Sequence, residues 1–288
     1  MRVLLTGSDG FVGREFQRHF QDAGDTVTCI DIKSNMDCRD YFKKSVTQFD
    51  LVVHLAAVVG GRMTIEGDPL RVATDLAIDS DMFNWAVKTE QPRVVYYSSS
   101  AAYPIKLQTS EHYLTETDIQ LDKIQTPDFS YGWAKLTGEM LAGYAEEQGV
   151  RVHVFRPFSG YGEDQDLDYP FPSFMQRIKD RDNPFIIWGD GHQVRDFMHI
   201  EDIVDATMTL VEFDVHGPTN LGLGRPTSFT DLAHMAFHAV GYEPKLKYLL
   251  DKPVGVQFRC SDPSKMLRYY KPKITLEEGI ERALKNGI

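Results

Sequence analysis

The feature that most constrains the fold is a glycine-rich turn near the N-terminus. The apolar run Val3–Leu5 is followed by Thr6-Gly7-Ser8-Asp9-Gly10-Phe11-Val12-Gly13 and then by a helical pattern. Between a strand and a helix, three such glycines permit a tight turn, a close approach of backbone amides to a pyrophosphate, and close packing of the helix on the strand. The helix N-terminus then presents free N–H groups to the phosphates. The turn therefore predicts a dinucleotide site at the first strand–helix junction.

Short apolar runs alternate with amphipathic stretches through the first half of the chain. Parallel strands joined in this way need crossover helices on both faces of the sheet, so the pattern predicts an α/β fold with a Rossmann-type, doubly wound parallel sheet. The expected strands are Val3–Leu5, Thr26–Ile30, Leu51–Leu55, Val94–Ser98 and Arg151–Phe155. The expected helices are Val12–Asp22, Pro69–Thr89 and Tyr131–Gln148.

The second half has a different pattern, with loops rich in Gly, Pro and aromatic residues and with shorter helices. We expect residues 1–156 to form the dinucleotide-binding domain. Residues 157–288 are expected to form a smaller C-terminal lobe over the carboxyl edge of the sheet, where ligands bind in doubly wound folds. The boundary is soft, because later segments can return strands to the main sheet. The expected helices of the lobe are Ile200–Glu212, Ser228–Val240 and Thr275–Asn286.

An acidic residue, Asp31, ends the second expected strand. A carboxylate at this place can accept hydrogen bonds from both ribose hydroxyls of NAD, and its charge repels the 2′-phosphate of NADP. The alternative is an ordinary solvated aspartate after a strand. We favour the cofactor interpretation because the glycines stand in register with Asp31, although Lys33 and Arg39 nearby leave NADP open.

A serine cluster and a Tyr–Lys pair supply candidate catalytic groups. Ser98–Ser100 end an expected strand, and about thirty residues later Tyr131 and Lys135 stand four apart, so that they project from one helix face. We expect the Lys135 ammonium to lower the pKa of Tyr131, so that the phenolate acts as a base near neutral pH. Two later pairs with this spacing follow no strand and serine cluster, and we interpret them as chance: Tyr248 with Lys252 and Tyr269 with Lys273.

The composition excludes several classes of partner. Lys and Arg number 31 against 42 Asp and Glu, a formal charge of −11, so neither nucleic acid nor an anionic membrane surface is expected as a partner. No apolar run is as long as a membrane span, and we expect no signal peptide before the first strand.

We assign no metal to His199, Glu201 and Asp202. A cytoplasmic location is expected because three cysteines form no CxxC pair: Cys29, Cys38 and Cys260.

Together, these motifs resemble the extended short-chain dehydrogenase/reductase family of NAD-dependent nucleotide-sugar epimerases, dehydratases and reductases. The resemblance covers nearly the whole chain. It implies NAD as cofactor, a nucleotide-diphosphate sugar as substrate, and a homodimer that pairs the helix Pro69–Thr89 and the helix of Tyr131 in a four-helix bundle. Besides the motifs above, it rests on four segments: His54–Ala57, Trp188–Gly191, Arg195–Phe197 and Leu276–Gly279.

The resemblance implies a role for each matching residue. Ser99 polarises the reacting oxygen, Tyr131 is the acid/base, and Lys135 binds the nicotinamide ribose. The implied cofactor contacts are Gly7, Gly10, Phe11, Val12, Gly13, Asp31, Ile32, Asp37, Cys38, Leu55, Ala56, Ala57, Asp75, Tyr131, Lys135, Pro157 and Phe158. The candidate substrate contacts are Gly61, Arg62, Ser99, Ser159, Trp188, Arg195 and Arg259. Among them, Trp188 offers an aromatic face for a base and Arg195 a fork for a diphosphate.

Position 101 separates the chain from several members of that family. The local likeness to GDP-fucose synthase and GDP-mannose 3,5-epimerase is strong at Val59–Gly61 and Ala77–Asp81. Both use a cysteine two residues after the catalytic serine, where this chain has Ala101. The 4,6-dehydratases place Asp-Glu where this chain has Ser100-Ala101. A 3,5-epimerase and a 4,6-dehydratase are therefore disfavoured.

What remains is the minimal Ser–Tyr–Lys set, which moves a hydride and a proton. The sequence predicts first an NAD-dependent nucleotide-sugar epimerase that acts at C4 through a transient 4-keto sugar and recycles its bound NAD. The alternative is an NAD(P)H-dependent nucleotide-4-keto-sugar reductase. A cofactor-sensing binding protein on the same fold is disfavoured, since such proteins tend to lose the tyrosine or the lysine.

Overall fold

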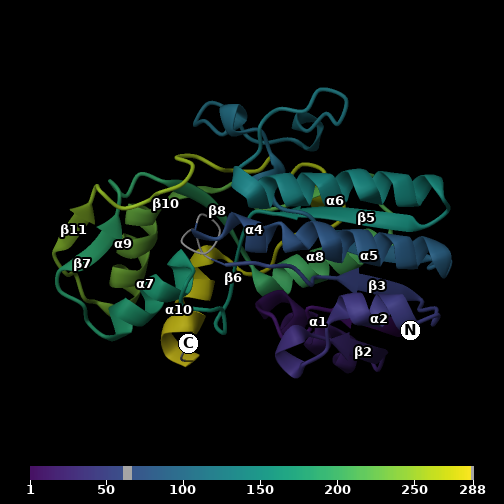
Figure 1. Cartoon of the computed structure of the whole chain (residues 1–288). Coiled ribbons are helices and arrows are strands. Elements are labelled where there is room, and N and C mark those ends of the chain that lie inside the picture. The colour runs from purple at the N-terminus through teal and green to yellow at the C-terminus, as the bar shows by residue number, and fades with distance from the viewer. Residues whose placement is uncertain (61–66, 287–288) are drawn as a thin grey trace.

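A computed structural model describes residues 1–60 and 67–286 of the chain (Figure 1). Its centre is a six-stranded sheet in the order β2-β1-β3-β4-β5-β9, in which every neighbouring pair is parallel. The predicted Rossmann-type parallel sheet is confirmed. The strands are β1 (Arg2–Thr6), β2 (Thr26–Ile30), β3 (Leu51–His54), β4 (Arg93–Tyr97), β5 (Arg151–Pro157) and β9 (Thr219–Leu221).

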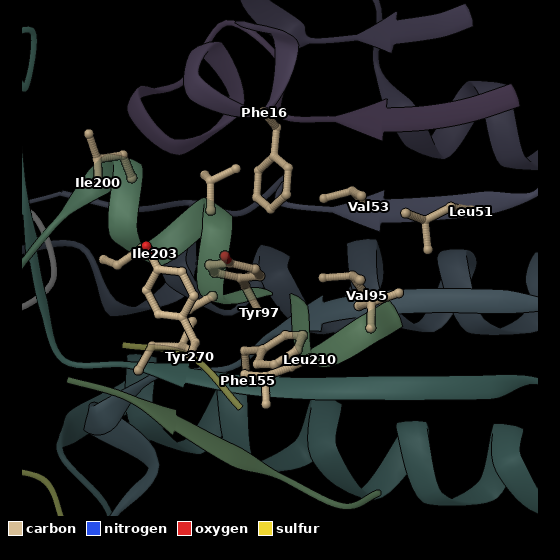
Figure 2. Packing of buried hydrophobic residues seen from close by; sticks show 14 of the residues in the cluster. Phe16, Leu51, Val53, Val95, Tyr97, Phe155, Ile200, Ile203, Leu210 and Tyr270 are labelled. Carbon is tan, nitrogen blue, oxygen red and sulfur yellow. The ribbon is translucent and has the colours of Figure 1, made fainter. Parts of the chain in front are cut away.

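Helices cover both faces of this sheet because its strands are apolar on both sides. In β1, Val3 and Leu5 belong to one core cluster, whereas Leu4 between them belongs to the other. Figure 2 shows the first cluster, in which Phe16 and Ile203 pack against strand residues. The helices of this face are α1 (Phe11–Asp22) and α8 (Ile200–Glu212). Those of the opposite face are α2 (Cys38–Lys44), α5 (Thr74–Lys88) and α6 (Phe129–Glu147).

The helix predicted over Pro69–Thr89 is divided at Ala73 into α4 (Pro69–Val72) and α5. Asp68 caps α4, since its side chain accepts a hydrogen bond from the Arg71 N–H at 3.1 Å. On α5, three large apolar side chains are buried in the core: Met82, Phe83 and Trp85.

A second lobe lies beside the sheet (Figure 1). It has its own core of aromatic and aliphatic side chains, Phe174, Phe185 and Ile280 among them. Its strands are β6 (Ser159–Tyr161), β8 (Val194–His199) and β10 (Pro226–Ser228) in one sheet, and β7 (Phe185–Trp188) and β11 (Leu246–Leu249) in another. Its helices are α7 (Pro170–Lys179), α9 (Phe229–Val240) and α10 (Leu276–Asn286).

The chain crosses between the two parts after the boundary that we predicted. The segment from α8 to β9 packs on and extends the main sheet, although it follows residue 156. Short 3-10 helices complete the described structure: η1 (Ile32–Ser34), η2 (Ser100–Ala102), η3 (Ile105–Leu107), η4 (Glu116–Asp118) and η5 (Met266–Arg268).

The parallel order brings the predicted site residues to one edge. The glycine turn follows β1, Asp31 follows β2, Leu55 follows β3, Ser99 follows β4 and Phe158 follows β5. Carboxyl ends of parallel strands share one edge of a sheet, and ligands bind there in doubly wound folds.

Candidate active site

The glycine turn has no room for side chains. Gly7 has φ +72°, and a Cβ there would lie 2.7 Å from the Ala56 nitrogen. A Cβ on Gly13 would lie 2.2 Å from the Gly7 carbonyl oxygen, and one on Gly10 would lie 3.2 Å from the same atom. The helix α1 therefore starts in direct contact with the turn, which leaves its N-terminal amides available for a pyrophosphate, as the dinucleotide prediction requires.

The side chain of Asp31 binds backbone N–H groups on both sides of its position, one of them in the glycine turn. Its Oδ2 accepts a hydrogen bond from the Asp9 N–H at 2.8 Å, and its Oδ1 accepts one from the Lys33 N–H, also at 2.8 Å. A carboxylate oxygen can accept more than one hydrogen bond, so the predicted contact with an adenine ribose is compatible with this arrangement. Arg39, the nearby cation that had left NADP open, pairs with Asp37 at 2.6 Å. A hydrogen bond from Arg39 holds the pKa of Asp37 below its ordinary value.

The remaining predicted cofactor residues border the same edge. Phe11 and Val12 begin α1, and the segment Leu55–Ala57 leaves β3, where the Leu55 N–H donates to the Thr6 carbonyl at 3.1 Å. Pro157 ends β5, and the Phe158 N–H donates to the Leu221 carbonyl. Ile32 is exposed, whereas Cys38 is buried, which raises the pKa of its thiol to about 12. Two predicted substrate residues, Gly61 and Arg62, lie outside the described residues.

The catalytic candidates come from two segments in contact. Ser99 follows β4, and its hydroxyl accepts a hydrogen bond from the Ala101 N–H at 3.1 Å. Tyr131 and Lys135 lie on the first turns of α6. A Cβ on Gly132 would lie 2.3 Å from the Ala101 carbonyl oxygen, so the glycine lets α6 pack directly on the serine segment. As a result, the Ser99 hydroxyl lies near enough to the Tyr131 phenol to favour its ionised form.

The protonation state of Tyr131 differs from the sequence prediction. Burial raises the pKa of this phenol, and the nearby carboxylates Asp75 and Asp79 raise it further. Lys135 and Ser99 act in the opposite direction, but the net pKa of Tyr131 lies above the ordinary value. The predicted lowering by Lys135 is present, but burial outweighs it, so the phenolate near neutral pH that the sequence analysis expected is not favoured. Tyr131 is thus a neutral phenol at neutral pH.

Sequence analysis missed the polar groups behind Lys135. Asp79 accepts hydrogen bonds from the Tyr96 hydroxyl at 2.6 Å and from His54 at 3.3 Å. Asp75, predicted as a cofactor contact, is completely buried; it accepts a hydrogen bond from Val58, and burial raises its pKa to about 6. The available signal was two aspartates four apart among apolar residues of one helix, a pattern that places both carboxylates on one face.

The predicted substrate residues of the second lobe lie on neighbouring segments. Trp188 ends β7 with 43% of its surface exposed. On β8, Arg195 donates to the carbonyl of Val256 at 2.9 Å, so its guanidinium lies beside the segment that carries Arg259. Ser159 begins β6 in the same sheet as β8.

Arg259 has a partner that the sequence did not reveal. It forms a buried ion pair with Asp128 at 2.6 Å, directly before α6, and donates to the Gln108 side chain at 2.7 Å. The substrate lobe is thereby tied to the start of the helix that carries Tyr131. The diphosphate contacts predicted for Arg195 and Arg259 stay predictions.

Comparison with known proteins decides the family. The family model for the NAD dependent epimerase/dehydratase family matches residues 3–222. The chain belongs to this family. A dTDP-4-dehydro-6-deoxy-D-allose reductase from Streptomyces sp is 27% identical over 92% of this chain and 89% of its own length. A probable GDP-L-fucose synthase from Oryza sativa subsp. japonica is 26% identical over 99% and 91%.

Solved structures share the fold of this epimerase/dehydratase family member. A UDP-glucose 4-epimerase from Thermus thermophilus, in complex with NAD, superimposes with a TM-score of 0.84 and 19% identity and covers 99% of this chain and 98% of that chain. The cofactor of the present protein is NAD, and the glycine turn described above has the shape that it needs.

The structure also bears on metal binding and on membrane-spanning helices. Among the residues that the structure describes, no three His, Cys, Asp or Glu side chains are gathered so that they could hold a metal ion. Asp202 instead accepts hydrogen bonds from the Lys273 and Ile274 N–H groups, at 2.8 and 2.9 Å. Over the same described ranges, none of the helices has both the length and the hydropathy of a membrane span.

Proposed function

We propose that this protein is a nucleotide-4-keto-sugar reductase, which converts a 4-keto group into a 4-hydroxyl at the expense of NADH. The relative from Streptomyces sp is named as a reductase of such a 4-dehydro sugar, and it aligns over most of both chains. The sequence placed this reaction second, behind a C4 epimerase. The environment of Tyr131 supports the reversed order.

The environment of Tyr131 carries the proposal, because desolvation and the neighbouring carboxylates Asp75 and Asp79 both favour the neutral phenol. Reduction of a ketone needs a proton donor at the carbonyl oxygen, whereas a C4 epimerase first removes a proton from a hydroxyl. Burial and the two carboxylates hold the pKa of Tyr131 above its ordinary value, so the resting site has a proton to give. This state suits the reductive direction.

The residues divide the work of the reaction. The substrate's 4-keto oxygen accepts hydrogen bonds from Ser99 and Tyr131, which polarise the carbonyl. NADH, when bound, supplies the hydride to C4. The Tyr131 proton passes to the oxygen as the alcohol forms, and the Lys135 ammonium stabilises the phenolate that is left until solvent returns a proton. Ala101 has no acid or base function, so the configurations at C3 and C5 are retained.

Turnover with a dTDP-4-dehydro-6-deoxy sugar and NADH tests the proposal. We expect one NADH consumed for each 4-hydroxy product formed, with unchanged configuration at C3 and C5. Isomer exchange of a nucleotide sugar without net NADH consumption would contradict the proposal and support the epimerase.

A C4 epimerase is the second candidate, because the position of Asp31 against the glycine turn favours NAD over NADP and is compatible with a permanently held cofactor. Mass spectrometry of the nucleotide released on denaturation separates the two. Stoichiometric NAD retained through purification favours the epimerase, whereas an empty site that binds NADH on demand favours the reductase.

The proposed assembly is a homodimer through α5 and α6. Both helices expose large apolar side chains, Leu76 on α5 and Trp133 and Tyr144 on α6, a feature typical of an interaction surface. Sedimentation of a Trp133→Glu, Tyr144→Glu variant tests it. We expect a monomer, and an unchanged sedimentation coefficient would contradict this interface.

A further inference from the structure

A buried chain of hydrogen bonds leads from the glycine turn to the carboxylate of Asp79. The Asp79 oxygens accept from the Tyr96 hydroxyl at 2.6 Å and from His54 Nε2 at 3.3 Å. Since an ionised carboxylate only accepts, His54 donates through Nε2, and its Nδ1 forms a hydrogen bond with the Thr6 hydroxyl at 2.8 Å. The Thr6 oxygen accepts in turn from the Ala56 N–H at 3.4 Å. Residues of β3 and β4 thus hold the carboxylate directly, and Thr6 of β1 holds His54 in turn.

The space for this network is built into α6. A Cβ on Gly138 would lie 1.8 Å from the Tyr96 hydroxyl oxygen and 2.6 Å from Asp79 Oδ2. Any larger residue, placed three positions after Lys135, would push the tyrosine and the carboxylate away from the helix. The glycine therefore makes room against α6 for the Tyr96 hydroxyl and for the Asp79 carboxylate of α5.

Lys135 lies beside this network, against the ring of Tyr96. It is 4% exposed, and its Nζ lies 5.4 Å from the centre of the Tyr96 ring and 5.8 Å from that of Tyr131. Burial alone works to lower the pKa of Lys135, but Asp79, Tyr131 and Asp75 together hold it above its ordinary value. Likewise, burial works to raise the pKa of Asp79, and Lys135 with the hydrogen bonds of His54 and Tyr96 holds it low.

We infer that Asp79 is a positioning residue: its carboxylate, fixed by Tyr96 and His54, is the counter-charge that holds the Lys135 ammonium against Tyr131. The inference concerns Lys135 itself, and it rests on the proposed function only where turnover is the readout. The other titratable groups that face this cluster are Asp75 on α5, Glu139 on α6 and Tyr169 before α7.

The first test measures stability and is independent of turnover. In Lys135→Met the Asp79 carboxylate stays buried without its counter-charge, so its folded-state pKa rises above the unfolded value. The resulting penalty is present at high pH and is relieved as the pH falls through the folded pKa. We expect the Tm of Lys135→Met, relative to the wild type, to rise from about pH 8 to about pH 5.

The matched control is the double variant Lys135→Met, Asp79→Asn. Because it lacks the Asp79 carboxylate, we expect the relative rise of Tm to be clearly smaller, with only the part due to Asp75 left. Parallel Tm curves of Lys135→Met and the wild type would overturn the inference. Equal curves of the single and the double variant would overturn it as well.

The second test uses the pH profile of turnover in Asp79→Asn. Without the counter-charge, Lys135 loses its proton more easily, and Tyr131 loses a neighbour that opposes its ionisation. Both effects move the alkaline limb of kcat to lower pH, by at least about one unit, a tenfold change in proton affinity. Asp81→Asn is the control on the same helix, since Asp81 pairs with Lys43 at the surface; its limb is expected to stay in place.

The two tests separate the two claims. If the wild type turns over no 4-keto sugar, the proposed reaction fails, while the Tm curves still judge Asp79. If Asp79→Asn folds and keeps the alkaline limb of the wild type, Asp79 does not act through Lys135 and the inference is wrong. If Asp79→Asn does not fold, the comparison of Lys135→Met with its double variant decides.

Discussion

Of the three segments of this chain that carry a tyrosine and a lysine four residues apart, two differ sharply in their surroundings. Tyr131 and Lys135 lie on α6, where Lys135 is 4% exposed and the buried carboxylates Asp79 and Asp75 raise its pKa. Tyr269 lies at the end of η5 with 41% of its surface exposed, and Lys273 forms a surface ion pair with Asp205 at 2.7 Å. No expected strand and serine cluster precede the second pair.

The difference shows that burial, and not the spacing alone, decides how strongly the lysine acts on the tyrosine. At the surface, water solvates Lys273, so its charge acts weakly on its surroundings. Around Lys135, burial removes water, and each neighbouring charge acts at close range and low effective dielectric constant. The proton equilibrium of Tyr131 is therefore set by desolvation and by three charged neighbours. A motif search counts only one of them, the lysine.

The largest difference between the two pairs is expected in kcat when the tyrosine hydroxyl of each pair is removed. Tyr131→Phe removes the proposed proton donor, so kcat with NADH and a 4-keto sugar should fall by about 10²–10⁴-fold. Tyr269→Phe, the same change in the second pair, should leave kcat unchanged. Steady-state kinetics of both variants test this, and a Tyr131→Phe enzyme with undiminished kcat would remove Tyr131 from the mechanism.

Replacing the lysine of each pair is expected to give a smaller difference in kinetics than replacing the tyrosine. Lys135→Met should raise KM for NADH and lower kcat together, because Lys135 is implied to bind the nicotinamide ribose and stabilises the tyrosine anion. Lys273→Met loses one exposed ion pair, which costs at most about 1 kcal/mol of stability, and its kinetics should match the wild type. Equal KM values for NADH in both variants would contradict the proposed role of Lys135.

The smallest expected effect concerns the pH dependence of stability. Burial raises the folded-state pKa of Asp75 to about 6, above the unfolded value, so its penalty is present above that pH and is relieved as the pH falls. Asp75→Asn should remove a gain of about 2 kcal/mol in unfolding free energy between neutral and acid pH. Urea unfolding at several pH values measures the slope. An unaltered slope in Asp75→Asn would be the contrary result.

The sequence was sufficient for the fold because the period of apolar residues reports burial directly. The strand Thr26–Ile30 and the helix Ile200–Glu212 lie where they were expected, and the glycine turn joins β1 to α1. The break at Ala73 was not predicted, since nothing in the apolar pattern marks it. The return of β9 to the main sheet was allowed for, but its position depends on long-range pairing.

The candidate site was only partly predictable for a related reason. Ser99 and Tyr131 carry local motifs, and the structure brings them together. The network of His54, Tyr96 and Asp79 joins three distant segments, so no window of the sequence contains it. The ion pair of Arg259 with Asp128 joins residues 131 positions apart in the same way. Interactions of this kind become visible only when the parallel strands have aligned their ends.

The central claim is that Tyr131 is a neutral phenol in the resting enzyme. A pH titration of tyrosinate absorbance, recorded as the difference between the wild type and Tyr131→Phe, measures this directly. We predict that no phenolate assigned to Tyr131 forms below its ordinary pKa of about 10. A phenolate already present near neutral pH would contradict the account and restore Tyr131 as the base of an epimerase.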